Sequence, residues 1–255
     1  MPQLLNAELI KNLAAHFLRR NGPEVSWMSA IGMHLFFPGV TGFWPGSVGG
    51  NLADTPDLSA NGQTMTTFGN TQLTVEGFAP VFVIPDDTSY LSTPDAVPNQ
   101  FGDFFFLGWV KFDALGAVQG LANKWGAVGN YAVRVYKSAA DAICLDVSDD
   151  GTTITTLAHP ATISVSRWYH VAASFTSNSG IMRVYVNAVK EELTVGVPTV
   201  LFNSTADFEL GRASNGVNDG LIGSGSLFAS GQRAEISEIH LKTLYSYTKA
   251  LYGYR

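Results

Sequence analysis

Two neighbouring segments with alternating side chains constrain the fold of this chain more than any other feature. Residues 167–175 (RWYHVAASF) and 181–187 (IMRVYVN) alternate large apolar side chains with smaller or polar ones. A period of two residues is the period of a β-strand. Between the segments, residues 177–180 (SNSG) supply the asparagine and glycine that tolerate the positive φ angles of a tight hairpin. The sequence therefore predicts two adjacent antiparallel strands.

Further strand-like segments follow at short, turn-bounded intervals. Residues 104–112 are apolar on both alternating faces, which predicts a central strand covered on both sides. Residues 149–151 (DDG) form a hairpin signal between residues 143–148 and 153–157. Glycine accounts for 26 of 255 residues and charged residues for only 14%, against a usual share of about 25%. This pattern is typical of an all-β sandwich rather than of alternating strands and helices.

The order of these segments resembles one known family. Residues 168–172 (WYHVA) and 184–188 (VYVNA) are similar to the paired-strand motifs of laminin-G-like domains in the concanavalin A-like lectin and glucanase superfamily. Residues 208–211 (FELG) and 234–241 (AEISEIHL) resemble a later strand and the closing strand of the same domains. The resemblance implies a two-sheet antiparallel jelly-roll β-sandwich.

The resemblance also divides the chain into three parts. We expect the sandwich to form one domain over residues 42–242. Residues 1–41 precede it as an arm that contains an amphipathic helix, and residues 243–255 follow it as a tyrosine-rich tail.

Both ends of the chain carry apolar surfaces that a sandwich core does not need. Residues 4–20 place apolar side chains at helical spacing, and the Asn-Gly-Pro sequence at 21–23 ends that predicted helix. Residues 24–43 are too apolar for a free linker. We expect both ends to dock onto other protein subunits, with self-docking on the sandwich as the alternative. The expected docking residues are Leu9, Leu13, Phe17, Trp27, Phe36 and Tyr252.

The resemblance to glucanases raises the question of glycoside hydrolysis, which normally uses two carboxylates facing one bond. The candidate pair is Glu235 and Glu238. On a regular strand, residues three apart point to opposite faces, so this pair fails unless a bulge intervenes. The glucanases that this region resembles also carry an acidic residue where this chain has Ser237. We therefore assign no catalytic residue and predict a protein that is not an enzyme.

Side-chain chemistry and the resemblance together suggest two ligand sites. Asp86 and Asp87 are candidates for Ca²⁺, because some relatives hold calcium through aspartate and backbone oxygens at the sandwich rim. The alternative is that both bond to their own turn. Trp125, Tyr131 and Tyr136 are candidates for stacking on the apolar face of a sugar, with packing inside the domain as the alternative. No other cofactor is predicted.

Charge and composition argue against several classes of partner. The net charge is −6, from 21 acidic and 15 basic residues, and no window concentrates Lys or Arg, so nucleic-acid binding is disfavoured. No stretch approaches the ~18 apolar residues of a membrane span, and we find no signal peptide. Cys144 is the single cysteine, so no disulfide framework is expected within the chain. His170, beside Trp168 in the strand motif, is expected to hold a structural hydrogen bond.

Three functions are consistent with these features. The leading prediction is a non-enzymatic structural or interaction protein, specifically a bacteriophage virion component such as a capsid decoration or tail-associated protein. It would be made in the host cytoplasm and assemble with other subunits or as a homo-oligomer. This prediction rests on the apolar ends, the lack of a catalytic constellation and the frequent display of laminin-G-like modules on phage particles. The alternative is a carbohydrate-binding module for a surface glycan, and the third is a glycoside hydrolase.

Overall fold

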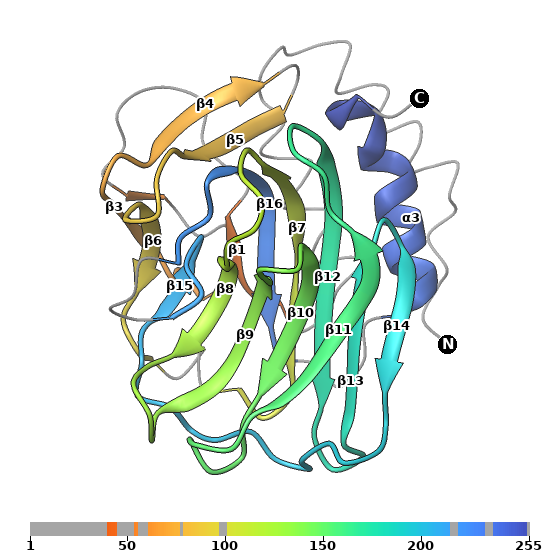
Figure 1. Ribbon diagram of the computed structural model, residues 1–255. Helices are drawn as coiled ribbons and strands as arrows, with labels where there is room; N and C mark the ends of the chain where they lie inside the picture. Colours follow the sequence, from red (N-terminus) through yellow and green to blue (C-terminus); the bar gives the residue numbers. More distant parts are fainter. Residues whose placement is uncertain are drawn as a thin grey trace.

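Two β-sheets stacked face to face make up the computed structural model of this chain (Figure 1). Within the residues that the structure describes, every strand pair is antiparallel. The predicted two-sheet sandwich is therefore confirmed. The predicted arm, with Leu9, Leu13, Phe17, Trp27 and Phe36, lies outside the described residues. The described residues are 40–44, 54–55, 61–76, 79–96, 101–214, 219–232 and 237–253.

The first sheet has the strand order β14-β13-β12-β7-β16-β5-β4, with β1 also paired to β16. Its strands are β1 (Val40–Trp44), β4 (Gln72–Glu76), β5 (Ala79–Ile84), β7 (Phe104–Phe112), β12 (Trp168–Thr176), β13 (Ile181–Val186), β14 (Val189–Leu193) and β16 (Gly223–Gly231).

The second sheet has the order β11-β10-β9-β8-β15-β6-β3-β2 and lies in front in Figure 1. Its strands are β2 (Asp54–Thr55), β3 (Met65–Phe68), β6 (Tyr90–Thr93), β8 (Gln119–Trp125), β9 (Tyr131–Lys137), β10 (Ala142–Val147), β11 (Thr155–Thr162) and β15 (Phe208–Leu210).

The hairpin predicted over residues 167–187 is present as β12 and β13. Ala173 of β12 lies opposite Val184 of β13. In the connecting turn, Asn178 and Gly180 have φ angles of 61° and 59°, in the left-handed region that asparagine and glycine tolerate best. Strand β7 pairs with the other side of β12, so the hairpin is built into the interior of the sheet.

Strand β7 is covered on both faces, as its sequence predicts. One set of its side chains is buried in the core between the sheets: Phe104, Phe106, Val110 and Phe112. The other set is buried on the outer face of the first sheet: Phe105, Leu107 and Trp109.

The strand predicted over residues 234–241 is wrong for residues 237–241, while residues 234–236 lie outside the described part of the chain. The chain forms helix α3 from Glu238 to Thr248, followed by the 3₁₀-helix η2 (Lys249–Tyr252). The reason is visible in the spacing of the residues that face the sheet, because Leu241, Leu244, Tyr245 and Thr248 recur at intervals of three and four. The helix also crosses the predicted domain boundary between residues 242 and 243. No helix among the described residues is long and apolar enough to cross a membrane.

Strand β16 is the last strand of the sandwich along the described chain, the role that the sequence interpretation gave to residues 234–241, and it lies inside the first sheet. It pairs with β7, β5 and β1, although its sequence GSGSLFASG has little of the usual strand composition. Packing explains its small residues. The ring of Phe228 fills the space that Cβ atoms at two glycines would need. A Cβ atom at Gly108 would lie 2.3 Å from this ring, and a Cβ atom at Gly225 would lie 2.1 Å from it. Glycine is needed at both positions for the ring to fit.

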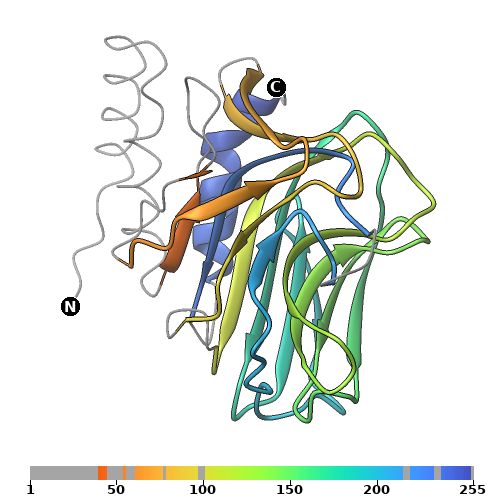
Figure 2. The ribbon, with the colours of Figure 1, turned by 90° about the vertical axis from the view of Figure 1, so that its left-hand side faces the viewer.

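Helix α3 packs on the outer face of the first sheet (Figure 2). The ring of Trp109 lies between two tyrosine rings, with its centroid 5.7 Å from that of Tyr245 and 4.3 Å from that of Tyr252. The indole N–H of Trp109 donates to Thr248 Oγ1 (2.9 Å), and the hydroxyl of Tyr252 donates to Ser226 Oγ (2.7 Å). Tyr252 was expected to dock a partner, but it is buried against its own sheet, so the self-docking alternative applies at this end of the chain.

Strand β14 forms one edge of the first sheet and carries a small network of ion pairs. Glu192 accepts from the Arg183 guanidinium at 2.6 Å and from the Lys190 ammonium at 3.3 Å. These contacts lower the pKa of Glu192, with the hydrogen bond from Arg183 as the largest cause.

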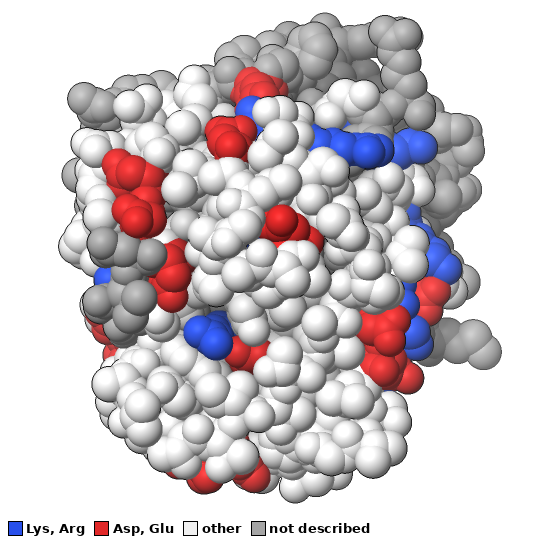
Figure 3. Space-filling model, in the orientation of Figure 1, with Lys and Arg blue, Asp and Glu red and all other residues white. Residues whose placement is uncertain are grey.

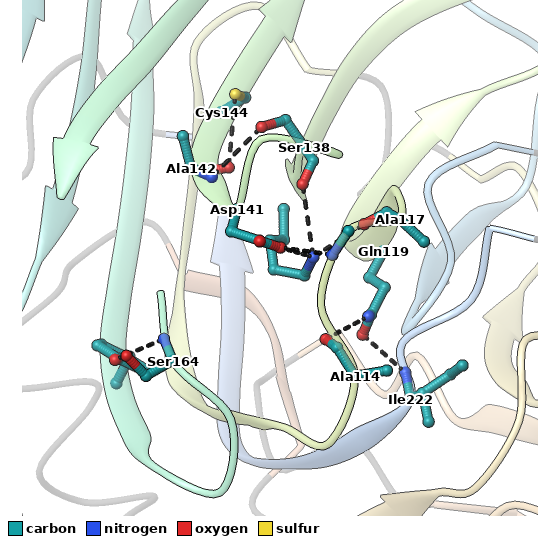
Figure 4. A network of polar contacts seen from close by, with 12 residues as sticks. Ala114, Ala117, Gln119, Ser138, Asp141, Ala142, Cys144, Ser164 and Ile222 are labelled. Atoms are coloured by element: carbon teal, nitrogen blue, oxygen red, sulfur yellow. Dashed lines mark hydrogen bonds and ion pairs between the residues drawn. The ribbon is translucent and has the colours of Figure 1, made fainter. Parts of the chain in front are cut away.

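A buried lysine ties loops together at one end of the sandwich (Figure 4). The ammonium of Lys137 donates to Asp141 Oδ1 (2.6 Å) and to the carbonyl oxygen of Ala117 (2.8 Å). The bond from Lys137 holds the pKa of the Asp141 carboxyl below its ordinary value. At the same end, the side chain of Gln119 accepts from the backbone N–H of Ile222 (3.0 Å), which connects β8 to the start of β16.

Candidate functional site

A row of polar side chains crosses the outer face of the second sheet. These residues lie opposite one another on consecutive strands, while their neighbours along the strands, such as Val135 and Leu145, are buried in the core between the sheets. From β11 to β3 the row consists of Thr156, Asp146, Arg134, Asn123, Glu209, Ser92 and Thr66.

Arg134 is the centre of an aromatic group on this face, formed with Trp125, Tyr131 and Tyr136. Its guanidinium carbon lies 4.6 Å from the ring centroids of both Trp125 and Tyr136. The rings of Trp125 and Tyr131 stack with centroids 4.4 Å apart and planes 9° apart. We call these four residues the Arg134 group.

Asp146 holds Arg134 and Tyr136 of the Arg134 group through hydrogen bonds. Its carboxylate accepts from Arg134 Nε (2.8 Å), from Thr156 Oγ1 (2.6 Å) and from the Tyr136 hydroxyl (3.3 Å). The side chain of Asp146 is buried, so these bonds replace its hydration. Burial, followed by the nearby charge of Asp146, raises the pKa of the Tyr136 phenol. The charge of Arg134 is therefore already paired within the chain.

The structure brings together the three aromatic residues predicted to bind sugar, but it buries two of them. Trp125 is 2% exposed and Tyr136 is 9% exposed, and their faces contact Arg134. Tyr131 is only half-buried. Trp125 and Tyr136 therefore follow the packing alternative, and they do not offer the open ring faces that we expected.

A segment between β15 and β16 explains the burial of Tyr136, because it crosses the same face. A Cβ atom on Gly120 of β8 would lie only 1.8 Å from the carbonyl carbon of Arg212, so the segment rests directly on this glycine. Ala213 packs against Tyr136 and Cys144. The Asp219 carboxylate accepts from the backbone N–H of Ala213 at 3.2 Å and holds the segment in place.

A second aromatic group, which the sequence interpretation missed, lies on the β3 side of this segment. The rings of Phe68 and Tyr90 stack with centroids 4.7 Å apart and planes 5° apart, and the guanidinium of Arg212 lies 4.5 Å from the centroid of Tyr90. Phe68 is 41% exposed. We call Phe68, Tyr90 and Arg212 the Phe68 group. A sequence signal did exist, since Phe68 directly precedes the Gly69-Asn70 turn, but β3 is too short to show clear alternation.

Glu209 and Asn123 connect the two groups. Asn123 Nδ2 donates to Glu209 Oε2 (3.1 Å) and to the carbonyl oxygen of Arg212 (2.7 Å), while Asn123 Oδ1 accepts from the backbone N–H of Trp125 (3.1 Å). Arg212 Nη1 lies 3.5 Å from Glu209 Oε1. Burial raises the pKa of the Glu209 carboxyl. Hydrogen bonds and ion pairs thus connect both aromatic groups to the same row of polar side chains.

Asp146 and Glu209, the two carboxylates of the polar row, lie far apart on the sheet. Asp146 on β10 and Glu209 on β15 are three strand spacings apart, roughly 14 Å between their backbones. Of the pair predicted from sequence, Glu235 lies outside the described residues. Glu238 is at the start of α3, where its contact with the Lys242 ammonium (2.6 Å) lowers its pKa.

The carboxylate of Asp86 is already engaged in hydrogen bonds with neighbouring residues of the chain. Its carboxylate accepts from Asn70 Nδ2 (3.0 Å), from the backbone N–H and hydroxyl of Thr88 (3.1 and 2.8 Å) and from the Ser89 hydroxyl (2.7 Å). These hydrogen bonds, with that of Asn70 the largest, lower the pKa of Asp86 to about 2. In the part of the chain that the structure describes, no three or more Asp, Glu, His or Cys residues group to hold a metal. The contacts of Asp86 follow the turn alternative, and nothing observed at Asp87 supports calcium.

The charges on this face are dispersed rather than gathered into a basic patch (Figure 3). Acidic side chains lie over the side of the sheet that contains β3 and β6. Carboxylates accept hydrogen bonds from hydroxyl groups and repel phosphate. The face therefore suits a ligand rich in hydroxyl groups better than a polyanion.

Comparison with solved structures shows the same fold in bacterial binding domains. The chain is similar to the binding domain of Paraclostridial Mosquitocidal Protein 1, with 15% sequence identity, a TM-score of 0.63, and coverage of 82% of this chain and 52% of that one. It is similar to the Botulinum neurotoxin serotype G binding domain, with 13% identity, a TM-score of 0.62, and coverage of 83% and 51%. The serotype D ligand-binding domain in complex with N-acetylneuraminic acid gives 12% identity, a TM-score of 0.65, and coverage of 84% and 52%.

The chain thus spans about half the length of each of these structures. A search of curated proteins finds no match. The family model described as "Concanavalin A-like lectin/glucanases superfamily", of the laminin-G type, matches residues 85–228, which is more than half of the chain. The match covers the strands of both aromatic groups except β3. The chain therefore belongs to the concanavalin A-like lectin and glucanase superfamily.

Proposed function

We propose that this chain is a non-catalytic binding module that recognises a glycan at the Phe68 group. The observation that carries the proposal is Phe68 itself. Its ring is 41% exposed on the outer face of a sheet, yet it is held parallel to Tyr90, which is in turn covered by Arg212. An exposed ring that is fixed in orientation can pack on the apolar face of a pyranose without losing side-chain freedom on binding.

The surroundings of Phe68 support a hydroxyl-rich ligand. Thr66 is exposed on the same face of β3, two residues from Phe68, so a hydroxyl group lies beside the ring. Three structures similar in fold are titled as binding domains, and one of them holds N-acetylneuraminic acid. At identities of 15% or less this likeness supports a binding role without naming the ligand.

The virion function stays a prediction without an observation in its favour. Its main support was the apolar arm, which lies outside the described residues, and the docking role of Tyr252, which is buried against the chain's own sheet. The proposed localisation in a virion and the assembly with other subunits remain untested for the same reason. The carbohydrate-binding alternative is therefore the function that the described residues support best.

A glycan array probed with the wild-type protein and with Phe68→Ala tests this proposal. We expect the wild type to bind at least one glycan, and Phe68→Ala to weaken that binding by roughly 10- to 100-fold, or about 1.4–2.8 kcal/mol, because the stacking surface is lost. Phe68→Tyr keeps the ring face and should bind nearly as well as the wild type.

The matched control is Val195→Ala, which removes another exposed apolar side chain, in the loop after β14. It should leave binding unchanged. Silence of the wild type across neutral and acidic glycans would contradict the function itself. Equal binding by the wild type and Phe68→Ala would move the site away from the Phe68 group.

A further inference from the structure

The ring of His170 is enclosed between the first sheet and helix α3. Register places Trp109 of β7 opposite His170 of β12, and Ser226 of β16 opposite Trp109. The His170 ring lies 5.3 Å from that of Trp109 and 6.0 Å from that of Tyr245 on α3. His170 is completely buried.

The expected side-chain hydrogen bond of His170 is not formed. Its backbone N–H donates to Asn187 Oδ1 (3.0 Å), and its carbonyl accepts from the Asn187 backbone, but neither ring nitrogen has a hydrogen-bond partner among the described residues. The prediction was wrong for the ring, because the alternation of β12 turns this side chain toward the helix. A buried imidazole without a partner is tolerated only in its neutral form.

The charged groups near α3 are paired elsewhere or lie outside this enclosure. Lys111 of β7 binds Glu76 at 2.6 Å, Arg183 of β13 binds Glu192, and Glu238 of α3 binds Lys242. The remaining titratable groups on the elements around His170 are Tyr169, Tyr185, Lys190, Glu191, His240, Tyr245, Tyr247, Lys249 and Tyr252. Burial is the only cause that acts on the pKa of His170, and it lowers this pKa to about 3. No described carboxylate offsets it.

Ring packing holds the helix over His170. Two hydrogen bonds also join the sheet to α3 and η2, from Trp109 to Thr248 and from Tyr252 to Ser226. A helix on the face of a sheet lacks the ladder of backbone hydrogen bonds that connects the core strands, so it opens more easily than they do. A state with the helix undocked would expose His170 to water and restore its ordinary protonation.

We propose that helix α3 is an acid-sensitive latch whose undocking is coupled to protonation of His170. The undocked state binds the proton at the ordinary pKa of about 6.5, and the docked state binds it only near pH 3. Docking is therefore at full strength above pH 6.5 and weakens as the pH falls. Each pH unit below 6.5 raises the ratio of undocked to docked molecules about tenfold. This latch does not depend on the proposed glycan site.

Hydrogen exchange of the full chain, followed by mass spectrometry from pH 7.5 to 4.5, tests the latch. After correction for the intrinsic pH dependence of exchange, the undocked fraction reported by the α3 amides should rise roughly 50-fold between pH 6.5 and 4.5 in the wild type. His170→Gln should remove most of this rise, because glutamine does not titrate. If His170→Gln does not fold, His170→Phe fills the same apolar site and should give the same flat profile.

His240→Gln is the matched control, since His240 lies on α3 itself. It should keep the wild-type response. A response that survives in His170→Gln and His170→Phe, or that disappears in His240→Gln, would overturn the proposal. An independent NMR titration of the wild type should show that the His170 ring stays neutral in the docked state down to at least pH 4. A folded-state pKa of His170 near 6.5 would also overturn the proposal.

Discussion

Replacement of Trp109 by alanine is expected to lower the free energy of unfolding by roughly 3–5 kcal/mol. This ring is buried between Tyr245 and Tyr252 and borders His170, so its loss leaves a cavity beneath the helix and removes both stacking contacts. The hydrogen bond to Thr248 is lost as well. Urea unfolding followed by far-UV circular dichroism measures the change.

A second variant separates the contribution of ring packing at Trp109 from that of its hydrogen bond to Thr248. Thr248→Val removes the acceptor of the Trp109 N–H and keeps the shape, so it should cost only about 1–3 kcal/mol. Limited proteolysis should cut Trp109→Ala within α3 before the strands are attacked. A loss below about 1 kcal/mol for Trp109→Ala would show that the helix contributes little to the fold.

Substitution of Gly120 by alanine is expected to have a comparable effect for a different reason. The added Cβ atom would lie 1.8 Å from Arg212 C, 1.9 Å from Ala213 N and 2.1 Å from Arg212 O. These are backbone atoms, so no side-chain rotation relieves the overlap, and the segment over the second sheet must move. We expect a loss of about 3 kcal/mol or more in the free energy of unfolding.

Gly102→Ala is the control for this prediction. A Cβ atom at Gly102 meets nothing within 4 Å, so this variant should be near neutral, within about 0.5 kcal/mol. Gly120→Ala should also uncover Tyr136 and Cys144, which Ala213 now covers, so Cys144 should react faster with a thiol reagent at a pH where the folded fraction is unchanged. Equal stability of the two alanine variants would contradict the assignment of Gly120 as the support of this segment.

The sandwich could be predicted because its central strands obey the simple period of two. Residues 167–187 showed both the alternation and the turn chemistry of β12 and β13, and β7 showed its two apolar faces. Strand β16 could not be recognised in the same way. Its composition follows from the Phe228 ring over Gly108 and Gly225, a contact between residues far apart in the chain.

The functional site was harder to predict than the fold. Aromatic residues were correctly placed on one face, but a sequence does not reveal that Ala213 covers Tyr136 or that Arg134 fills the space between two rings. Phe68 was missed because β3 has only four residues. For α3, the similarity of residues 234–241 to a family strand outweighed helical spacing that was present in the sequence. Long-range packing therefore explains the errors at Trp125 and Tyr136, whereas the errors at Phe68 and α3 arose from local sequence signals that were weak or were given too little weight.

The ion pairs on β14 restrict how copies of this domain can associate. An edge strand normally offers unpaired N–H and C=O groups to another strand. Here Lys190 and Glu192 lie on the edge strand, Arg183 of the neighbouring β13 pairs with Glu192, and a second strand would have to displace water from these charges. Extension of the first sheet from one copy into the next is thus disfavoured at β14. An assembly of this chain would have to use another edge strand, such as β4 or β11, or the faces of the sandwich, its loops or its ends.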